Sequence, residues 1–157
     1  MKKWILLLAG VVLAMALVGC SQKESKASWT EEHGQDILNS GAFSEELEEL
    51  DLDTAFMLYK LEDAGLSRED LTGGLCRRSA GATCEELAVL IFGDEKAAEA
   101  AVQSLQTYLE GQIASNTDYR PAEIPKLEGA WVEKRGNTVL MVVANDVEAA
   151  KEAVGSK

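Results

Sequence analysis

The segment E-L-A-V-L-I-F at residues 86–92, followed by Gly93-Asp94, decides the fold. A short and almost wholly apolar run that stops at a glycine is typical of a buried β-strand. The pattern Thr83-x-x-Glu86 just before it matches a helix capping box and favours a helix instead. The β-branched and aromatic side chains and the short length favour the strand, with one helical turn before it as a remaining option.

A long amphipathic helix is predicted directly after this strand. Asp94 is a suitable N-terminal cap, and the residues that follow it are rich in alanine. Apolar side chains recur at helical spacing and form a stripe along one side. The stripe consists of Ala98, Ala101, Val102, Leu105, Leu109 and Ile113. We expect this side of the helix to pack on the sheet.

A β-hairpin and a last helix are predicted beyond it. Residues 130–133 and 138–144 form the two strands, and Arg135-Gly136-Asn137 forms the turn. The nearly continuous apolar residues of the second strand favour an inner position in the sheet, whereas the first strand fits an edge. A capping box that begins at Asn145 precedes a helix over residues 147–154.

Together these elements predict an α+β fold. If residues 75–80 pair with the strand at residues 86–92, the order becomes ββαββα. Such a chain forms a small four-stranded, mostly antiparallel sheet with helices packed on one face. N-terminal helices are predicted before this sheet over residues 29–40, 44–50 and 55–61, although the last of these also fits a strand.

The N-terminus carries an export signal. Met1-Lys2-Lys3 is basic, residues 4–16 are uncharged and apolar, and Leu17-Val18-Gly19-Cys20 matches the lipobox of bacterial lipoproteins. Residues 1–19 are therefore predicted to be a lipoprotein signal peptide, with Cys20 lipidated and first in the mature chain. An uncleaved anchor helix is the alternative, but the apolar stretch is shorter than the ~20 residues that a membrane-spanning helix needs.

Lipid on Cys20 is expected to hold the protein on the extracytoplasmic face of the cell membrane. More than one acyl chain, such as palmitate, makes a stable anchor. Residues 20–28 are polar and are expected to form a flexible tether. Residues 29–157 have the length of one domain and are expected to form a single α+β domain.

The mature chain is strongly acidic. The whole sequence has 15 Lys and Arg residues against 27 Asp and Glu residues. Residues 1–19 contain two of the lysines, so 13 basic residues remain against 27 acidic ones and the net charge becomes about −14. Such a surface repels nucleic acid and anionic lipid. We therefore expect no nucleic-acid partner, and attachment to the membrane through lipid alone.

Several segments of the chain resemble a known family. They are residues 38–43 with the acidic stretch after them, residues 79–89, residues 118–127 and residues 136–146. They are similar to a family of lipoproteins from clostridia-type Gram-positive bacteria that is catalogued as a domain of unknown function. The resemblance spans nearly all of the mature chain and is most specific in Gly81-Ala82-Thr83 and Tyr119-x-Pro121. It implies no activity, ligand or catalytic residue. In the family pattern position 84 is usually Ala and position 76 is not Cys, so the cysteine pair is peculiar to this member.

Cys76 and Cys84 are the thiols that remain after lipidation of Cys20. Outside the cytoplasm such a pair favours a disulfide, and Gly81 between them fits a hairpin that would bring them together. Two unpaired, small core residues are the alternative, because anaerobic Gram-positive bacteria often lack oxidative folding. A redox or metal role lacks the C-x-x-C spacing or further soft ligands. We therefore expect no cofactor.

No catalytic or metal-binding residue is predicted. His33 is the only histidine and has no nucleophile motif beside it, so an exposed structural residue is favoured over a catalytic base. The acidic run at residues 45–53 offers several carboxylates to a divalent cation. It lacks a calcium-loop motif, however, and Leu47, Leu50 and Leu52 interrupt it at core-facing spacing. A solvated helix face is therefore expected.

The segment Tyr119-Arg120-Pro121 lies in an irregular stretch between the long helix and the hairpin. Loops often carry function, and an exposed Tyr and Arg suit a contact with a partner protein. In the alternative, Tyr119 packs on the sheet and Pro121 only ends the helix.

These observations predict a lipid-anchored extracytoplasmic binding or assembly module, with an envelope protein as its partner and without enzymatic activity. An envelope-acting hydrolase and a small-solute receptor are the alternatives. The hydrolase lacks a nucleophile motif, a set of metal ligands and a second histidine. The receptor usually needs two lobes, for which the mature chain is short.

Overall fold

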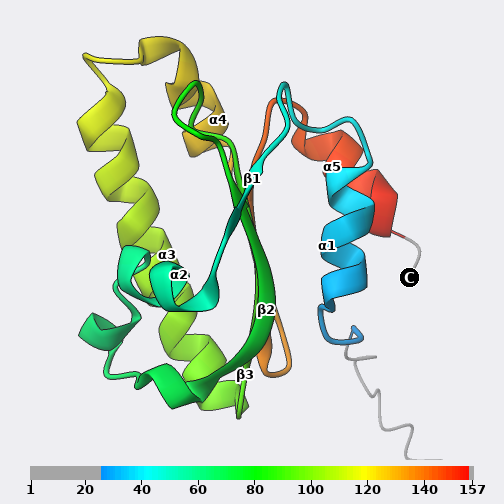
Figure 1. Ribbon diagram of the computed structural model, residues 1–157, viewed down its shortest axis with the longest axis vertical. Coiled ribbons are helices and arrows are strands. Elements are labelled where there is room, and N and C mark those ends of the chain that lie inside the picture. The colour runs from blue at the N-terminus through cyan, green and yellow to red at the C-terminus, as the bar shows by residue number, and fades with distance from the viewer. Residues whose placement is uncertain (1–25, 156–157) are drawn as a thin grey trace, which may run out of the picture.

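A five-stranded antiparallel sheet forms the middle layer of the protein (Figure 1). The computed structural model describes residues 26–155. The predicted signal peptide, Cys20 and most of the predicted tether therefore lie outside the described residues. The strands are β1 (Glu48–Leu50), β2 (Leu71–Arg78), β3 (Glu86–Phe92), β4 (Trp131–Arg135) and β5 (Thr138–Val143). They lie side by side in the order β1-β2-β3-β5-β4.

The segment that decides the fold is the central strand β3. It pairs with β2 on one side and with β5 on the other. Leu87 and Val89 pack on one face of the sheet, whereas Ala88, Leu90 and Phe92 pack on the other. This alternation is that of a strand whose two faces are both covered, which explains why the run is apolar almost throughout. The predicted strand and the ββαββα order of β2, β3, α3, β4, β5 and α5 are confirmed. β2 covers residues 71–78 instead of the predicted 75–80, and the stretch expected to be irregular after α3 contains η3 (Pro121–Glu123) and α4 (Ile124–Glu128).

Helices cover both faces of the sheet (Figure 1). The bounds are α1 (Glu31–Leu38), α2 (Leu52–Leu58), α3 (Glu95–Asn116), α4 (Ile124–Glu128) and α5 (Val147–Val154), with short 3₁₀ turns η1 (Leu61–Ala64), η2 (Arg68–Asp70) and η3 (Pro121–Glu123). α2, α3 and α4 pack on one face, and α1 and α5 pack on the other. The expectation that the helices of the ββαββα unit share one face was wrong, because α3 and α5 lie on opposite faces. Because β3 and β5 are apolar on both sides, both sides need a layer of helices.

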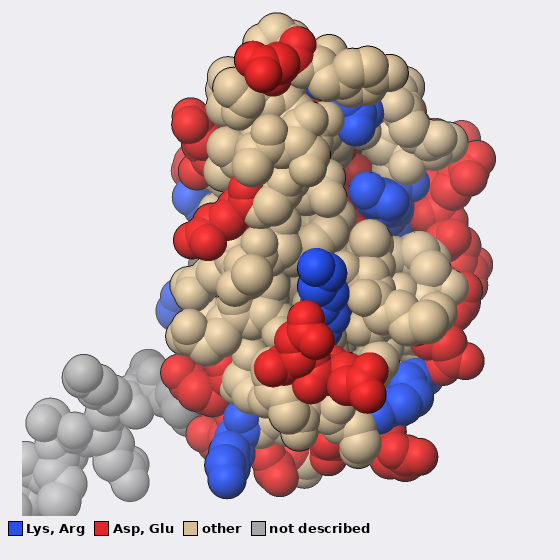
Figure 2. Space-filling view, turned by 90° about the vertical axis from the view of Figure 1, so that its left-hand side faces the viewer, with Lys and Arg blue, Asp and Glu red and all other residues tan. Residues whose placement is uncertain are grey.

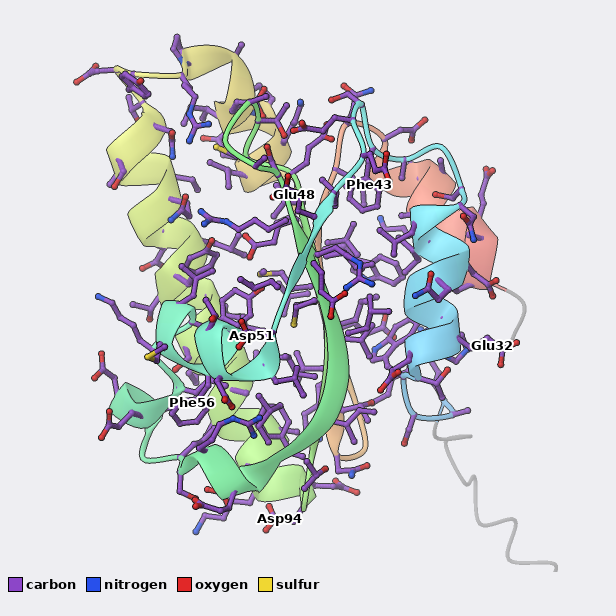
Figure 3. The ribbon with its side chains drawn as sticks, in the orientation of Figure 1. Glu32, Phe43, Glu48, Asp51, Phe56 and Asp94 are labelled. Atoms are coloured by element: carbon purple, nitrogen blue, oxygen red, sulfur yellow. The ribbon has the colours of Figure 1, made fainter. Side chains whose placement is uncertain are left out.

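A helix was predicted over residues 44–50, but the structure has the additional strand β1 there. Phe43 lies on the side of α1 and α5 (Figure 3), where Leu47 is also buried, but Leu50 packs against the α3 side. Apolar side chains that point to both sides fit an extended chain rather than one face of a helix. In β1, Glu49 stands opposite Arg77 of β2, and their side chains form an ion pair at 3.8 Å. The sheet therefore has five strands instead of the predicted four.

Helix starts follow the capping signals of the sequence closely. Thr30 caps α1, Asp51 caps α2, and Asp94 caps α3 at the lower end of the view in Figure 3. α5 differs from the prediction, because Asp146 rather than Asn145 accepts the hydrogen bond from the backbone N–H of the third helical residue. A short polar side chain at either position could serve, so the sequence alone did not separate them.

The described chain enters the domain at Trp29, which is buried on the side of α1 and α5. Its backbone N–H donates to Thr138 Oγ1 at 2.8 Å, and its indole N–H donates to the backbone carbonyl of Glu133 at 2.9 Å. The guanidinium of Arg135 lies 3.4 Å from the centre of the indole ring, and the ring of Trp131 meets it edge-on at 5.4 Å. The point where the tether would join is therefore fixed to the β4–β5 hairpin.

Within residues 26–155, no helix combines the length and the apolar character that crossing a bilayer requires.

Candidate functional site

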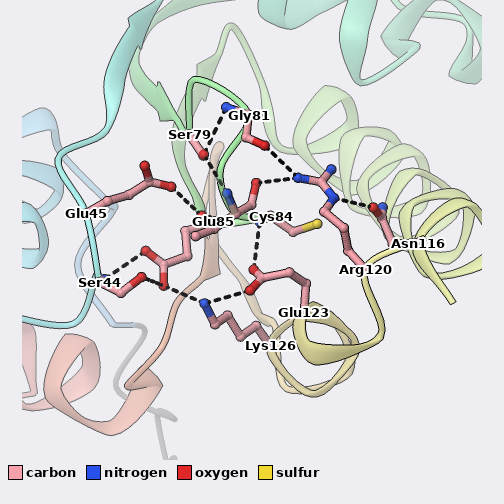
Figure 4. A network of polar contacts seen from close by, with 11 residues as sticks. Ser44, Glu45, Ser79, Gly81, Cys84, Glu85, Asn116, Arg120, Glu123 and Lys126 are labelled. Atoms are coloured by element: carbon pink, nitrogen blue, oxygen red, sulfur yellow. Dashed lines mark hydrogen bonds and ion pairs between the residues drawn. The ribbon is translucent and has the colours of Figure 1, made fainter. Parts of the chain in front are cut away.

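Arg120 joins the loop before β3 to the segment after α3 (Figure 4). Its Nη1 donates to the backbone carbonyls of Gly81 at 3.0 Å and Thr83 at 3.2 Å. Its Nε donates to the side-chain oxygen of Asn116, near the end of α3, at 2.9 Å. The Ser79 hydroxyl accepts backbone hydrogen bonds from Gly81 and Thr83 within the same loop. These contacts fix a loop that has no regular secondary structure.

A fully buried carboxylate, Glu85, lies beneath this loop. It accepts hydrogen bonds from the backbone N–H and the hydroxyl of Ser44, at 2.8 and 2.7 Å. The ammonium of Lys126 lies 3.0 Å from the Glu85 carboxylate and 3.1 Å from that of Glu123. Glu123 in turn accepts the backbone N–H of Cys84 at 2.8 Å. We use the name polar clamp for these five residues and two of the loop contacts above: Ser44, Cys84, Glu85, Glu123 and Lys126, together with Thr83 and Arg120.

The polar clamp connects segments that are far apart in sequence. Burial by itself would lower the pKa of the Lys126 ammonium, but hydrogen bonds and charges from Glu85 and Glu123 outweigh burial and raise that pKa. The Thr83 hydroxyl donates to Glu45 at 2.6 Å, which brings the chain before β1 into the same network. Because the buried acid and its cation already have partners, the polar clamp is suited to holding backbone in place rather than to reacting.

A second buried carboxylate, Glu86, begins β3 and lies on the face that α2 and α3 cover. The hydroxyls of Tyr59 and Tyr108 donate to it at 2.7 and 2.8 Å, and Arg78 lies at 3.8 Å. Burial raises the pKa of the Glu86 carboxyl, although both hydrogen bonds act to lower it. Burial, followed by the charge of Glu86, raises the pKa of both tyrosine hydroxyls, so they remain donors. The two rings meet edge-on with their centres 5.1 Å apart.

Cys76 and Cys84 are free thiols in the structure, so the predicted disulfide is not formed. The register pairs Cys76 with Ala88, and the pairing continues to a hydrogen bond from the Ser79 N–H to the Glu85 carbonyl. Cys84 therefore lies opposite a position four residues beyond Cys76, about 13 Å along the strand, which is too far for a bridge. Burial raises the pKa of the Cys76 thiol to about 12, which makes this thiol unreactive.

The two residues predicted to contact a partner have different roles. The Tyr119 side chain is 81% exposed and does not pack on the sheet. Arg120 directs its guanidinium inward to the polar clamp, with its central carbon 5.9 Å from the centre of the Tyr119 ring. Tyr119 thus remains available to a partner, whereas Arg120 holds the segment that presents it.

The other predicted candidates have local structural roles. The His33 ring accepts the backbone N–H of Thr30 and completes the cap of α1. The acidic run is not a helix face, since it contains β1, and Asp51 within it caps α2. Among the residues that the structure describes, no group of three or more His, Cys, Asp or Glu side chains is arranged to hold a metal ion.

Sequence reasoning missed most of the polar clamp. Lys126 and Glu85 are 41 residues apart, and nothing local connects them. One signal was present in Glu85-Glu86 at the start of an apolar strand. Adjacent strand residues point to opposite faces, so at least one of these acids had to be buried and to need a partner.

The chain matches one protein family, described as a domain of unknown function (DUF4358), over residues 44–144. The matched range begins at Ser44 of the polar clamp and includes all five strands, α2, α3 and α4. α1 and α5, which cover the second face of the sheet, lie outside it. No curated protein and no solved structure matches the chain.

Proposed function

The chain belongs to this family of unknown function, and we propose that it is a lipid-anchored binding or assembly module on the extracytoplasmic face of the cell membrane. The lipobox at residues 17–20 supports the anchor, and the basic and apolar residues before it support export. We further propose a role without catalysis, since the polar clamp offers no reactive group and the sequence has no nucleophile motif.

The domain has two ends, and the tether would join only one of them (Figure 1). Ser28 lies beside Gly136 in the turn between β4 and β5. α4 and the loop before β3 lie at the other end of the sheet, one strand length away, which for β4 is about 17 Å. A protein held by its N-terminus therefore presents the polar clamp away from the point of attachment.

The observation that carries the proposal is an exposed aromatic side chain on a rigid base. Tyr119 is 81% exposed, and the Arg120 next to it is hydrogen-bonded to the loop before β3 and to α3. Gly81 and Ala82, at the tip of that loop, are exposed as well. Tyr is enriched at protein interfaces, and a side chain on a fixed backbone loses less conformational entropy when it binds. We propose that Tyr119 and this loop tip form the contact with an envelope protein.

A photo-crosslinking amino acid placed at position 119 in living cells tests this contact. Met57 on α2 is the matched control, because it is 69% exposed and is the other large hydrophobic side chain at the surface of residues 26–155. We expect a defined crosslinked protein from position 119 and not from position 57. Tyr119→Ala should reduce recovery of that protein while changing stability by less than about 0.5 kcal/mol. Equal products from both positions, or none from position 119, would refute the contact.

The anchor is tested separately through Cys20. Cys20→Ala removes the thiol that would accept the lipid, so we expect no labelling by a fatty-acid analogue and accumulation of the uncleaved precursor. Metabolic labelling and detergent partitioning measure both effects. A variant that is still processed and still enters the detergent phase would show that the anchor is not at Cys20.

A further inference from the structure

A pocket of about 450 Å³ opens between η1 and the middle of α3. It lies on the α3 side of the molecule, the side that faces the viewer in Figure 2. There, Asp and Glu side chains lie along both margins, and a further acidic group adjoins a basic side chain in the lower middle, with uncharged surface around it. The size is that of small-molecule sites. All of the lining residues lie between Leu58 and Ser115, within the range that matches the family.

One wall of the pocket contains a residue with left-handed backbone conformation. Lys60 has a φ of 52°, and it is the only non-glycine residue of the described chain with a positive φ. It stands between α2 and η1, and its carbonyl accepts the hydroxyl of Ser104 from α3 at 3.3 Å. Because Lys60 directly follows Tyr59, the C-cap of α2, its left-handed conformation ends that helix, a role that glycine or asparagine fills more often. The hydrogen bond from Ser104 to Lys60 joins the two walls of the pocket.

The side chains of α3 that line the pocket are neutral and can form hydrogen bonds. Gln103 and Gln112 each offer an amide that both donates and accepts, and Thr107 and Ser115 offer hydroxyls. Lys60 and Asp63 contribute one charge of each sign. The pocket thus has paired donors and acceptors but no net charge to bind an ion.

Two of the residues that line the pocket are aromatic, Tyr108 and Tyr59. Their hydroxyls donate to the buried Glu86, and their rings pack edge-on. Tyr59 is 0% exposed, whereas Tyr108 is partly exposed, so Tyr108 is the one that offers ring surface to a ligand. An aromatic surface next to amide and hydroxyl groups complements a ring that has apolar C–H groups on its face and hydroxyls around its edge.

We propose that this pocket binds a neutral saccharide, of which an N-acetylated sugar makes the fullest use of the two side-chain amides. A peptide fits less well, because extended peptides are captured by an exposed sheet edge, whereas these walls are helices and turns whose backbone groups are already bonded. An anionic ligand is disfavoured by the excess of acidic residues over the whole chain. Such a site would make the protein a receptor for envelope glycan in addition to its protein contact.

Gly111 allows the pocket to be filled without damage to the fold. A Cβ added at Gly111 meets no atom within 4 Å, and the residue lines the pocket from α3. Gly111→Leu should occupy the pocket, and it should leave stability equal or higher, because Gly in a helix interior is unfavourable. Ala114→Leu is the matched control, since Ala114 is exposed on the same helix and does not line the pocket.

The binding test uses the domain in solution with di-N-acetylchitobiose as the probe, and follows backbone amide chemical shifts. We expect saturable shifts at Thr107, Gly111 and Gln112 in the wild type and in Ala114→Leu, and affinity at least about ten-fold weaker in Gly111→Leu. A blocked tri-alanine peptide serves as the second probe. The proposal is overturned if the sugar causes no pocket shifts at millimolar concentration, if Gly111→Leu binds it as well as the wild type, or if only the peptide binds.

Discussion

Lys126→Met tests whether the polar clamp holds the distal end of the domain together. The substitution keeps the aliphatic length of the side chain and removes only the charge. Glu85, which is 0% exposed, then keeps its two hydrogen bonds from Ser44 but loses its cation. Removing one partner of a buried ion pair costs about 3–5 kcal/mol. Because Lys126 is 15% exposed and Ser44 still solvates the acid, we expect the lower end, about 3 kcal/mol.

Urea titration followed by far-ultraviolet circular dichroism measures this loss. For an unfolding slope of about 1.5–2 kcal/mol per molar, the midpoint should fall by about 1.5–2 M. Lys151→Met is the control, because Lys151 and Glu148 form a 2.7 Å pair whose side chains are 43% and 76% exposed. It should cost less than about 0.5 kcal/mol. Glu85→Gln combined with Lys126→Met should recover part of the loss. Equal midpoints for the two lysine variants, or no recovery in the double variant, would refute the reasoning.

Further predictions concern the sheet, the second buried acid and the thiols. Gly74→Ala should cost about 2 kcal/mol or more in a urea titration, because Gly74 has a φ of 145° and an added Cβ would strike the Val89 carbonyl. Burial raises the folded-state pKa of Glu86, so the stability it contributes is complete below the ordinary value of 4.5 and is lost as pH rises through the raised pKa. Stability relative to the wild type should therefore increase with pH for Glu86→Gln, and a constant difference between about pH 5 and pH 8 would contradict this. Cys76 and Cys84 should both be recovered as thiols by mass measurement of unreduced protein, and Cys76 should react with iodoacetamide only after unfolding.

Local signals in the sequence were sufficient for much of the fold. The apolar run of β3, the Asp94 cap of α3 and the turn at Gly136, with its φ of 56°, each depend on neighbouring residues alone. β1 could not be predicted in this way, because three residues carry little strand signal and their conformation follows from pairing with β2. The second helical layer was missed for a different reason. The continuous apolar residues of β5 indicate two covered faces, but they do not say which helices cover which face, and α1 and α5 reach theirs from opposite ends of the chain.

The candidate sites were harder to predict than the fold, because they depend on contacts between distant segments. Tyr119 was correctly singled out as a loop residue, but the inward direction of Arg120 depends on a loop 39 residues earlier in the chain. The pocket depends on the approach of η1 to α3. The positive φ of Lys60 was not predicted, because the residues that usually adopt this conformation are glycine and asparagine. The position just after a helix often adopts this conformation, but lysine is not a residue type that favours it.

The position of Trp29 determines what intrinsic fluorescence can report. Trp29 and Trp131 are the tryptophans of residues 26–155, and their rings are 5.4 Å apart on the side of α1 and α5. Their emission therefore reports on that layer and on the junction with the tether. It does not report on the α3 layer, whose aromatic side chains are Phe and Tyr. If tryptophan emission and circular dichroism change at different urea concentrations, the layer of α1 and α5 unfolds independently of the rest of the domain. Energy transfer from the tyrosines beside Glu86 to these indoles offers an optical measure of whether the two layers separate.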